Sequence, residues 1–333
     1  MAQPPFRLPD SIPGAEAAGM PSALTEQIPT QPEPAPAARY ATTGHPEFDP
    51  RTGALRERTF PAIAGAALRD PRDATRMARV RLMKGIDFVY SRFLNMGVEQ
   101  AMAHEVLSQA VQVGPAQMPD LWVLLHRACR VLDVRAPDLF VGHSEAAAQT
   151  VGHERPFILV DTGTLDLLDD DELVFVLGRE VGHILLGHVT YKMLARSIGV
   201  IGEAVGNFTL NVGAMVTTGL EAPLRDWDQF SEFSADRAGL LAVQRREVAI
   251  NALLQLAGGG HRFGGSLDAT AFIEQGRRAL TGERPAGARL SAIVRSLQAG
   301  APILAARAAA LSDWHAGDEY RALLRGVYPR RAI

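Results

Sequence analysis

The sequence predicts an α+β protein in which a small β-sheet packs on one long helix within a mainly helical domain. Helical periodicity of apolar residues occurs before residue 133, short β-rich runs occupy residues 138–161, and helical periodicity returns from residue 169 onward. Helices on either side of one group of strands are typical of α+β proteins. The 333 residues, 47% of them hydrophobic, allow one large domain or two ordinary ones.

The first 60 residues are expected to form a disordered Pro/Ala-rich tail. Residues 1–50 hold 11 of the 21 prolines and few large apolar side chains, so they cannot bury enough surface to offset their chain entropy. The N-terminus lacks the apolar segment of a secretory signal, and the single cysteine, Cys129, can form no internal disulfide. We therefore expect a cytoplasmic protein with one folded domain over residues 70–325.

The helices and strands can be assigned in order along this domain. Asp70-Pro71 is typical of a helix start, and the apolar pattern predicts one helix through residues 76–94. A second helix follows Pro119 and ends near residue 132. The β-rich runs with turn residues between them predict strands within residues 139–143, 149–152 and 156–161.

Everything after residue 169 is predicted to be helical. Four acidic residues at 169–172 cap the free N–H groups of a helix that is expected to run to about Ser197. A second long helix follows, another begins near Pro223, and three or four more helices finish the chain after a glycine loop at 258–260.

Charge and hydropathy exclude some partners. The formal net charge of −3 gives no basic stripe for a nucleic-acid partner. No run of 18 uncharged apolar residues predicts an integral membrane span. The nearest candidate, residues 198–220, is interrupted by Glu203, Asn207 and Asn211 at a spacing of four. This polar stripe favours a helix packed in a core or a lid, with peripheral membrane contact as the alternative.

A possible catalytic motif lies in the long helix. Arg179 and His183 are one turn apart on the same helix face, and Glu180 lies beside them. In zincins both outer positions are histidines that bind zinc, and the inner glutamate is the general base. A Glu-x-x-His pair by itself occurs by chance in many chains, so the surrounding residues decide its meaning.

The surrounding residues resemble the HtpX-like and CAAX-prenyl-protease-type zinc metallopeptidases, the gluzincins of peptidase family M48. The resemblance rests on Asp171-Glu172-Leu173, Val176-Leu177-Gly178, Glu180, Gly182-His183-Ile184 and Gly187-His188. A second family motif follows as Glu232 and Ala235-Asp236, about fifty residues after Glu180. The resemblance covers roughly residues 70–320 and implies a zincin-like fold.

Carried over residue by residue, the resemblance makes His183 the second zinc ligand, Glu232 the third, and Glu180 the base that activates a metal-bound water. Asp236 would orient a ligand by a hydrogen bond. The chain departs from the family at two positions. Arg179 replaces the first ligand histidine. In the stretch 300–307, Ala301 stands where the family has a histidine that helps to stabilise the oxyanion.

The replacement at 179 divides the functional hypotheses. Guanidinium has no lone pair for a metal, so zinc is implied by the resemblance but opposed by this residue. Arg179 would either neutralise Glu180 and Glu232 or point to solvent. We expect a catalytically impaired pseudopeptidase that keeps a cleft for an extended peptide or protein segment. The alternatives are an active metal-dependent endopeptidase with a rearranged site and a structural protein that works through its tail.

Overall fold

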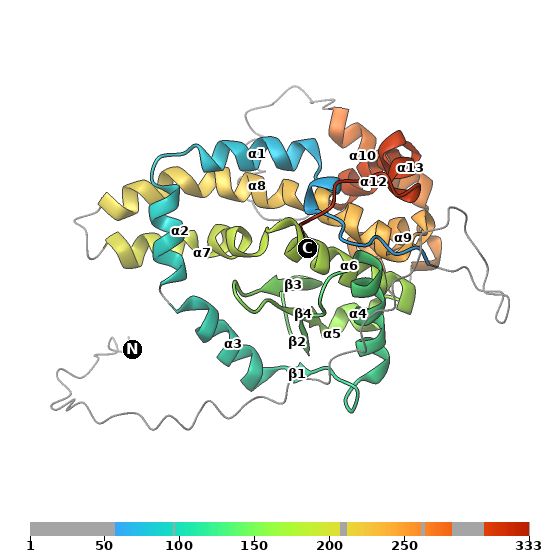
Figure 1. Ribbon diagram of the computed structural model, residues 1–333, viewed down its shortest axis with the longest axis horizontal. Coiled ribbons are helices and arrows are strands. Elements are labelled where there is room, and N and C mark those ends of the chain that lie inside the picture. Colours follow the sequence, from blue (N-terminus) through green and yellow to red (C-terminus); the bar gives the residue numbers. More distant parts are fainter. Residues whose placement is uncertain (1–56, 96, 207–211, 261–263, 282–302, 333) are drawn as a thin grey trace, which may run out of the picture. The chain divides into compact units, whose positions relative to one another are not determined.

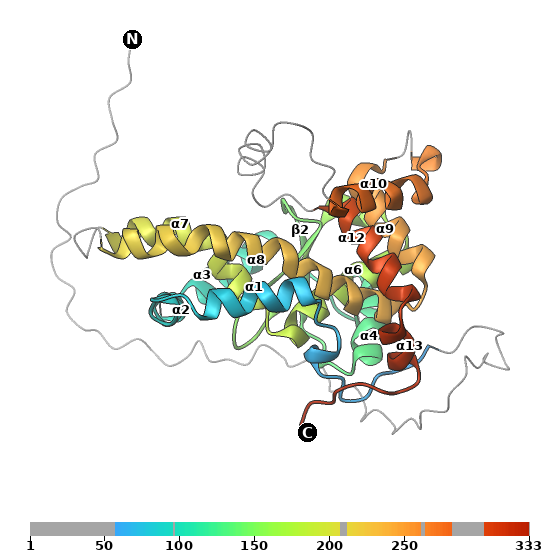
Figure 2. The same ribbon diagram turned by 90° about the horizontal axis from the view of Figure 1, so that it is seen from above.

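A computed structural model describes residues 57–95, 97–206, 212–260, 264–281 and 303–332 of the chain, apart from the side chains of 98 and 199–218. The described part is mainly helical, with one small sheet (Figures 1 and 2). The predicted tail lies almost wholly outside the described residues. Phe60, Ile63 and Leu68 are buried, and the Phe60 N–H donates to the Val131 carbonyl at 2.8 Å. The packed domain therefore begins before Asp70.

The sheet has four strands and mixed topology. Three strands correspond to the predicted runs, and a fourth, two-residue strand was not predicted; they are β1 (Val111–Gln112), β2 (Asp138–Gly142), β3 (Ala148–Val151) and β4 (Phe157–Asp161). The spatial order is β1-β2-β4-β3; β2 and β4 are parallel, whereas β1 pairs with β2 and β3 pairs with β4 in antiparallel fashion. Strand β3 therefore lies at one edge of the sheet.

Helix α6 (Asp170–Leu186) is the long helix that the sequence predicted, but it ends earlier than expected. Asp169 and Glu172 form a reciprocal capping box, with hydrogen bonds of 2.8 and 3.0 Å. Every residue from Glu172 to His183 is buried. The prediction that this helix continues to Ser197 is wrong. Gly187 adopts a left-handed φ of 68° and ends the helix, so that the chain bends by 94° before α7 (Val189–Gly206).

Two other helix boundaries also differ from the prediction. The expected helix through residues 76–94 is divided into α1 (Pro71–Arg81) and α2 (Ile86–Leu94), because Gly85 at φ 89° interrupts the helical backbone. Helix α8 (Val212–Val243) does not start near Pro223 but runs through it. Packing of α8 against α1 and α7 outweighs the one backbone hydrogen bond that proline removes.

The remaining helices pack around the sheet and the helices described above. They are α3 (Val98–Gln109), α4 (Pro119–Leu132), α5 (Thr162–Leu167), α9 (Arg246–Gly258), α10 (Ala269–Thr281), α12 (Leu304–Ala316) and α13 (Asp318–Leu324), with short 3-10 turns at Gly65–Ala67 and Gly264–Ser266. In the described part of the chain no single helix is long and apolar enough to cross a membrane; α6 and the first part of α7 pass that test only as a bent pair.

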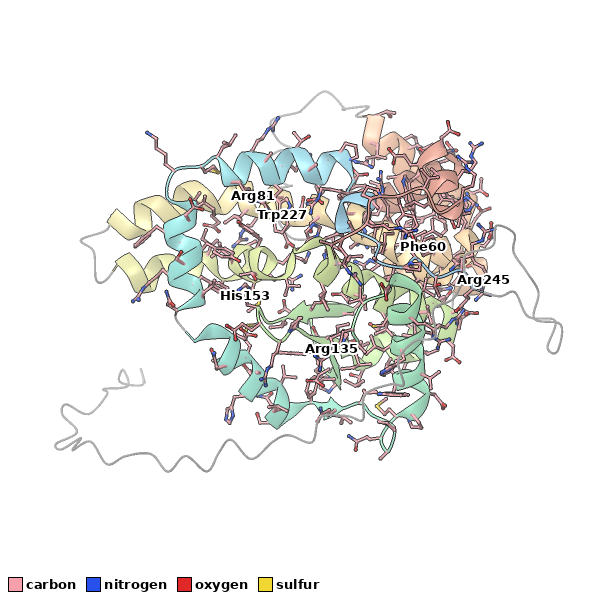
Figure 3. All side chains as sticks on the ribbon, in the orientation of Figure 1. Phe60, Arg81, Arg135, His153, Trp227 and Arg245 are labelled. Carbon is pink, nitrogen blue, oxygen red and sulfur yellow. The ribbon has the colours of Figure 1, made fainter. Side chains whose placement is uncertain are left out.

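Two apolar cores lie on opposite faces of the sheet. Alternate residues of β4 point to different cores: Ile158 and Val160 join α4, α6, α9 and α12, whereas Phe157 and Leu159 join α1, α2, α7 and the first half of α8. Phe60 and Trp227, one from each core, are labelled in Figure 3. Because both faces of β4 are covered, its sequence is continuously apolar rather than alternating.

Candidate functional site

The site forms where α6 and α8 approach each other closely. Gly178 and Gly182 face small residues of α8, and a Cβ added at Gly182 would lie 2.4 Å from the Cβ of Ala238. A Cβ at Gly239 of α8 would likewise lie 2.7 Å from Cγ of Arg179. These glycines let the backbones of α6 and α8 come close together, so that polar side chains of one helix reach those of the other.

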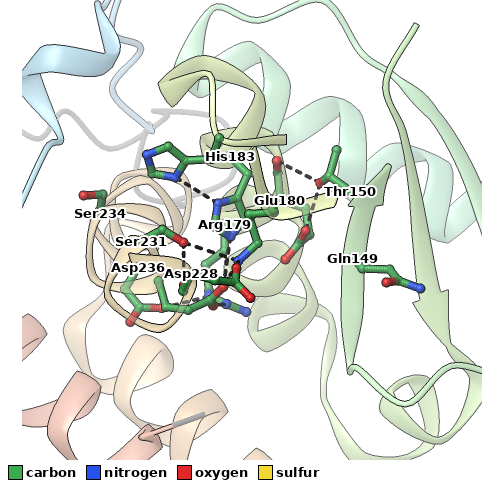
Figure 4. Close-up of polar contacts among 12 residues, drawn as sticks. Gln149, Thr150, Arg179, Glu180, His183, Asp228, Ser231, Ser234 and Asp236 are labelled. Carbon is green, nitrogen blue, oxygen red and sulfur yellow. Dashed lines mark hydrogen bonds and ion pairs between the residues drawn. The ribbon is translucent and has the colours of Figure 1, made fainter. Parts of the chain in front are cut away.

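Arg179 is buried and bonded to two carboxylates of α8. Its side chain is 6% exposed; Nε donates to Asp236 Oδ1 at 2.8 Å, and a terminal nitrogen donates to Glu232 (Figure 4). Burial lowers the pKa of this guanidinium, but Glu232 and Asp236 outweigh burial and raise it above its usual value. The alternative that Arg179 points to solvent is therefore wrong. Its hydrogen-bond partners are Glu232 and Asp236, and not the expected pair of Glu180 with Glu232.

Glu180 faces the sheet rather than the other carboxylates. Its side chain accepts a 2.8 Å hydrogen bond from Thr150 Oγ1, which comes from the edge strand β3 (Figure 4). Burial raises the pKa of Glu180, partly offset by the charge of Arg179. A carboxyl with a raised pKa next to an edge strand is suited to the role of a general acid or base.

His183 lies in a buried row of polar groups. Its Nε2 is 3.3 Å from Glu232 Oε1, and its Nδ1 is 3.2 Å from Nδ1 of His188. His188 Nε2 in turn lies 3.2 Å from Oδ2 of Asp73 on α1. Burial lowers the pKa of both imidazoles, and the charge of Lys192 lowers that of His183 further. Both rings are therefore neutral near pH 7.

Lys192 is a residue of this site that the sequence did not reveal. Its Nζ donates to Glu232 Oε1 and to Asp228 Oδ1, both at 2.6 Å, and lies 3.3 Å from Ser231 Oγ. Only 5% of the residue is exposed, and it is one of just two lysines in the chain. An ammonium group thus occupies the space beside the carboxylate that would bind metal.

Arg307 on α12 completes the network. It donates two hydrogen bonds to Asp236, from Nε at 2.8 Å and from a terminal nitrogen at 2.7 Å. Its other terminal nitrogen is 3.4 Å from Glu232. Asp236 therefore orients Arg179 and Arg307 and contacts no ligand histidine. Ala301, the other degenerate position, lies outside the described residues.

The donor set does not fit a zinc ion. Arg179 stands at the first ligand position, and the carboxylate of Glu232 already lies against Arg179, Lys192 and Arg307. Burial raises the pKa of Glu232, but Lys192 and Arg179 hold it well below its usual value. His183 is the one neutral nitrogen ligand that remains at the motif. Among the described residues no group of three or more histidines, cysteines or acids is arranged to hold a metal.

The helix crossing and its residues define the class of protein. A buried Glu-x-x-His on α6 faces a glutamate of α8, beside a small mixed sheet, as expected for a metallopeptidase scaffold. Residues 115–315 match peptidase family M48, and the chain belongs to this family. Its fold is accordingly the α+β fold of an M48 peptidase domain.

A curated relative supports the same family. The plastoglobule-localized metallopeptidase 48, chloroplastic, of Arabidopsis thaliana is 30% identical over 263 residues, which cover 77% of this chain and 74% of the relative. No solved structure matches the chain significantly.

Proposed function

We propose that this M48 member is a catalytically impaired pseudopeptidase that retains a binding site for an extended peptide. The observation that carries the proposal is that Glu232 forms ion pairs with both Arg179 and Lys192. Catalytic zinc sites use three protein ligands and a water. Here Arg179 stands at the first ligand position, and Arg179 and Lys192 neutralise Glu232 at the third. Glu180 would then face ordinary water, whose pKa of about 15.7 is too high for efficient activation at neutral pH.

The peptide-binding part of the proposal is supported by the position of β3 as an outer strand of the sheet. Asp161 N–H donates to the Ala147 carbonyl at 3.0 Å, so this pair and Gln149 with Leu159 are the hydrogen-bonded pairs of the ladder. The N–H groups of Ala148 and Thr150 then point away from β4. An extended peptide can add to such an edge as a further strand, next to Glu180.

The catalytic half of the proposal is tested by elemental analysis and casein cleavage on the same purified protein. We expect much less than one zinc per chain and no cleavage above that of Glu180→Gln. Stoichiometric zinc together with cleavage that Glu180→Gln abolishes would support the other candidate, an active endopeptidase with a rearranged site of Glu180, His183 and Glu232.

The binding half is tested by fluorescence anisotropy with extended peptides from casein. Ala148→Pro removes an outward N–H of β3 without breaking the ladder to β4, so it should weaken binding at least tenfold. Ala148→Gly keeps the N–H and is the matched control. Equal loss in both variants, or no binding by the wild type, would rule out recognition at this edge.

We further propose a cytoplasmic location. The support is the single thiol, Cys129, which is buried and whose pKa burial raises to about 12, so that it plays no part in disulfide chemistry. A fluorescent fusion of the full chain tests the location, and export from the cytoplasm would contradict it.

A further inference from the structure

The corner between α1 and α2 exposes two large apolar side chains. Leu82 is 85% exposed, the highest fraction for a large apolar residue in the described part of the chain, and Phe88 is 61% exposed. Most large apolar side chains of the described domain lie in one of the two cores. Two such residues within one seven-residue stretch call for a physical explanation.

The backbone of this corner is fixed, so the exposure is not that of a loose loop. Leu82 N–H donates to the Ala78 carbonyl at 3.2 Å, and Ile86 N–H donates to the Met83 carbonyl at 3.3 Å. Ile86 and the other inward residues of α2 are buried in the second core. Phe88 lies on the opposite face of the helix and is held outward by the packing of its neighbours.

Four exposed cations accompany these two residues. They are Arg79, Arg81, Lys84 and Arg92, with Arg81 labelled in Figure 3. None of the four forms an ion pair with another described residue, although the Arg81 guanidinium lies 5.9 Å from the ring centre of Tyr191. Asp87 is the one acid between residues 79 and 92, so this corner carries a net charge of +3 on a chain whose net charge is −3.

The four cations and the two apolar side chains are all exposed within the fourteen residues that form this corner. Arg92 lies four residues after Phe88 on α2, which is one helical turn, and Lys84 lies in the turn between Leu82 and the start of α2. Helix α2 packs beside α7, at the end of the described domain opposite to α9, α10, α12 and α13 (Figures 1 and 2). The corner is therefore a projecting surface and does not form part of the candidate site.

We propose that the α1–α2 corner binds the surface of an anionic lipid membrane. Leu82 and Phe88 enter the boundary between headgroups and acyl chains, while the four cations lie at the level of the lipid phosphates. A second copy of the chain fits less well, because a symmetric contact would set these unpaired cations against each other. The proposal is independent of the pseudopeptidase proposal, since it uses none of the residues of that site.

The test is flotation of the full chain with lipid vesicles. Wild-type protein should bind vesicles of phosphatidylcholine with about 30% phosphatidylglycerol at least tenfold more strongly than pure phosphatidylcholine vesicles, and raising salt from about 0.1 to 0.5 M should weaken binding. Leu82→Ser with Phe88→Ser should lower binding at least tenfold. Arg81→Glu with Lys84→Glu should do the same and should remove the dependence on salt.

Matched controls come from exposed apolar residues elsewhere. Val123 and Val327 are 50% and 66% exposed, and Val123→Ser with Val327→Ser should bind vesicles like the wild type. The proposal is overturned if the wild type does not bind anionic vesicles, if it binds both vesicle types equally, or if the control pair loses as much binding as the Leu82 and Phe88 pair. A dimer in solution that only the Leu82 and Phe88 pair abolishes would instead assign the surface to self-association.

Discussion

We expect zinc binding only when both Arg179 and Lys192, two of the cations that contact Glu232, are replaced. The perturbation is the double variant Arg179→His with Lys192→Met. Helix geometry would then place two imidazoles one turn apart, with Glu232 as the third ligand. Histidine and methionine are no larger than the residues that they replace, so neither change should overpack the site.

Arg179→His alone should not be enough, and the structure gives the size of the barrier. The ammonium of Lys192 lies 2.6 Å from Glu232 Oε1. A metal on the same carboxylate would be about 4 Å from this charge, where two unit charges repel by about 4 kcal/mol at an effective dielectric constant of about 20. The double charge of Zn²⁺ increases the repulsion, so the affinity should fall by at least about a thousandfold, since about 1.4 kcal/mol corresponds to tenfold.

The assay is a zinc titration of the melting temperature for the wild type, both single variants and the double variant. Without zinc, the double variant should be less stable than the wild type, because removing partners from a buried ion pair typically costs about 3–5 kcal/mol. At a hundredfold excess over Kd, zinc should stabilise it by about 2.7 kcal/mol, or roughly 5–10 °C for a domain of this size. Lys84→Met, at the other lysine, is the charge-removal control and should not respond.

Two results would refute this reasoning. If the wild type or Arg179→His alone responds to zinc as strongly as the double variant, Lys192 does not occupy the metal's place. If the double variant is folded by circular dichroism but takes up no zinc, then His183 and Glu232 are not positioned as ligands. Because only the double variant is expected to bind zinc, the two outcomes separate the effect of Lys192 from the positions of His183 and Glu232.

Three further predictions concern stability. Gly182→Ala should lower the unfolding free energy in urea by about 1–3 kcal/mol, because its Cβ would overlap α8; an unchanged midpoint would contradict the close helix contact. Burial raises the pKa of Asp73, but the contact with His188, the hydrogen bond from Ser234 and the charge of Arg69 bring it from 3.8 to about 2. The stability that Asp73 contributes is thus present above about pH 4 and lost as the pH falls towards 2. In acid titrations, Asp73→Asn should reduce this loss of unfolding free energy by about 2 kcal/mol. The assignment would be refuted if the unfolding free energy of the variant and of the wild type depended equally on pH. Deleting residues 1–56 should leave the melting temperature unchanged, whereas deleting 1–69 removes buried core residues and should lower it; the opposite order would show that the tail is docked.

Local sequence patterns determined the helix that carries the motif and the strands beside it. The acids at 169–172 set the start of α6 because capping acts within one turn. The three apolar runs between turns gave β2, β3 and β4. The sequence alone also shows that arginine stands at position 179, where the resemblance to family M48 implies a histidine. The resemblance to family M48 implied that Glu232 would lie beside this helix.

Only the tertiary structure decided which groups contact Glu232 and Asp236. In an unbroken helix Lys192 would lie nine residues after His183, about 180° round the helix axis and far along it. The bend at Gly187 instead turns α7 across the site, so that the ammonium of Lys192 reaches Glu232. Arg307 reaches Asp236 from 71 residues away through the packing of α12. Neither contact has a local sequence signal, because each depends on how separate helices pack in space.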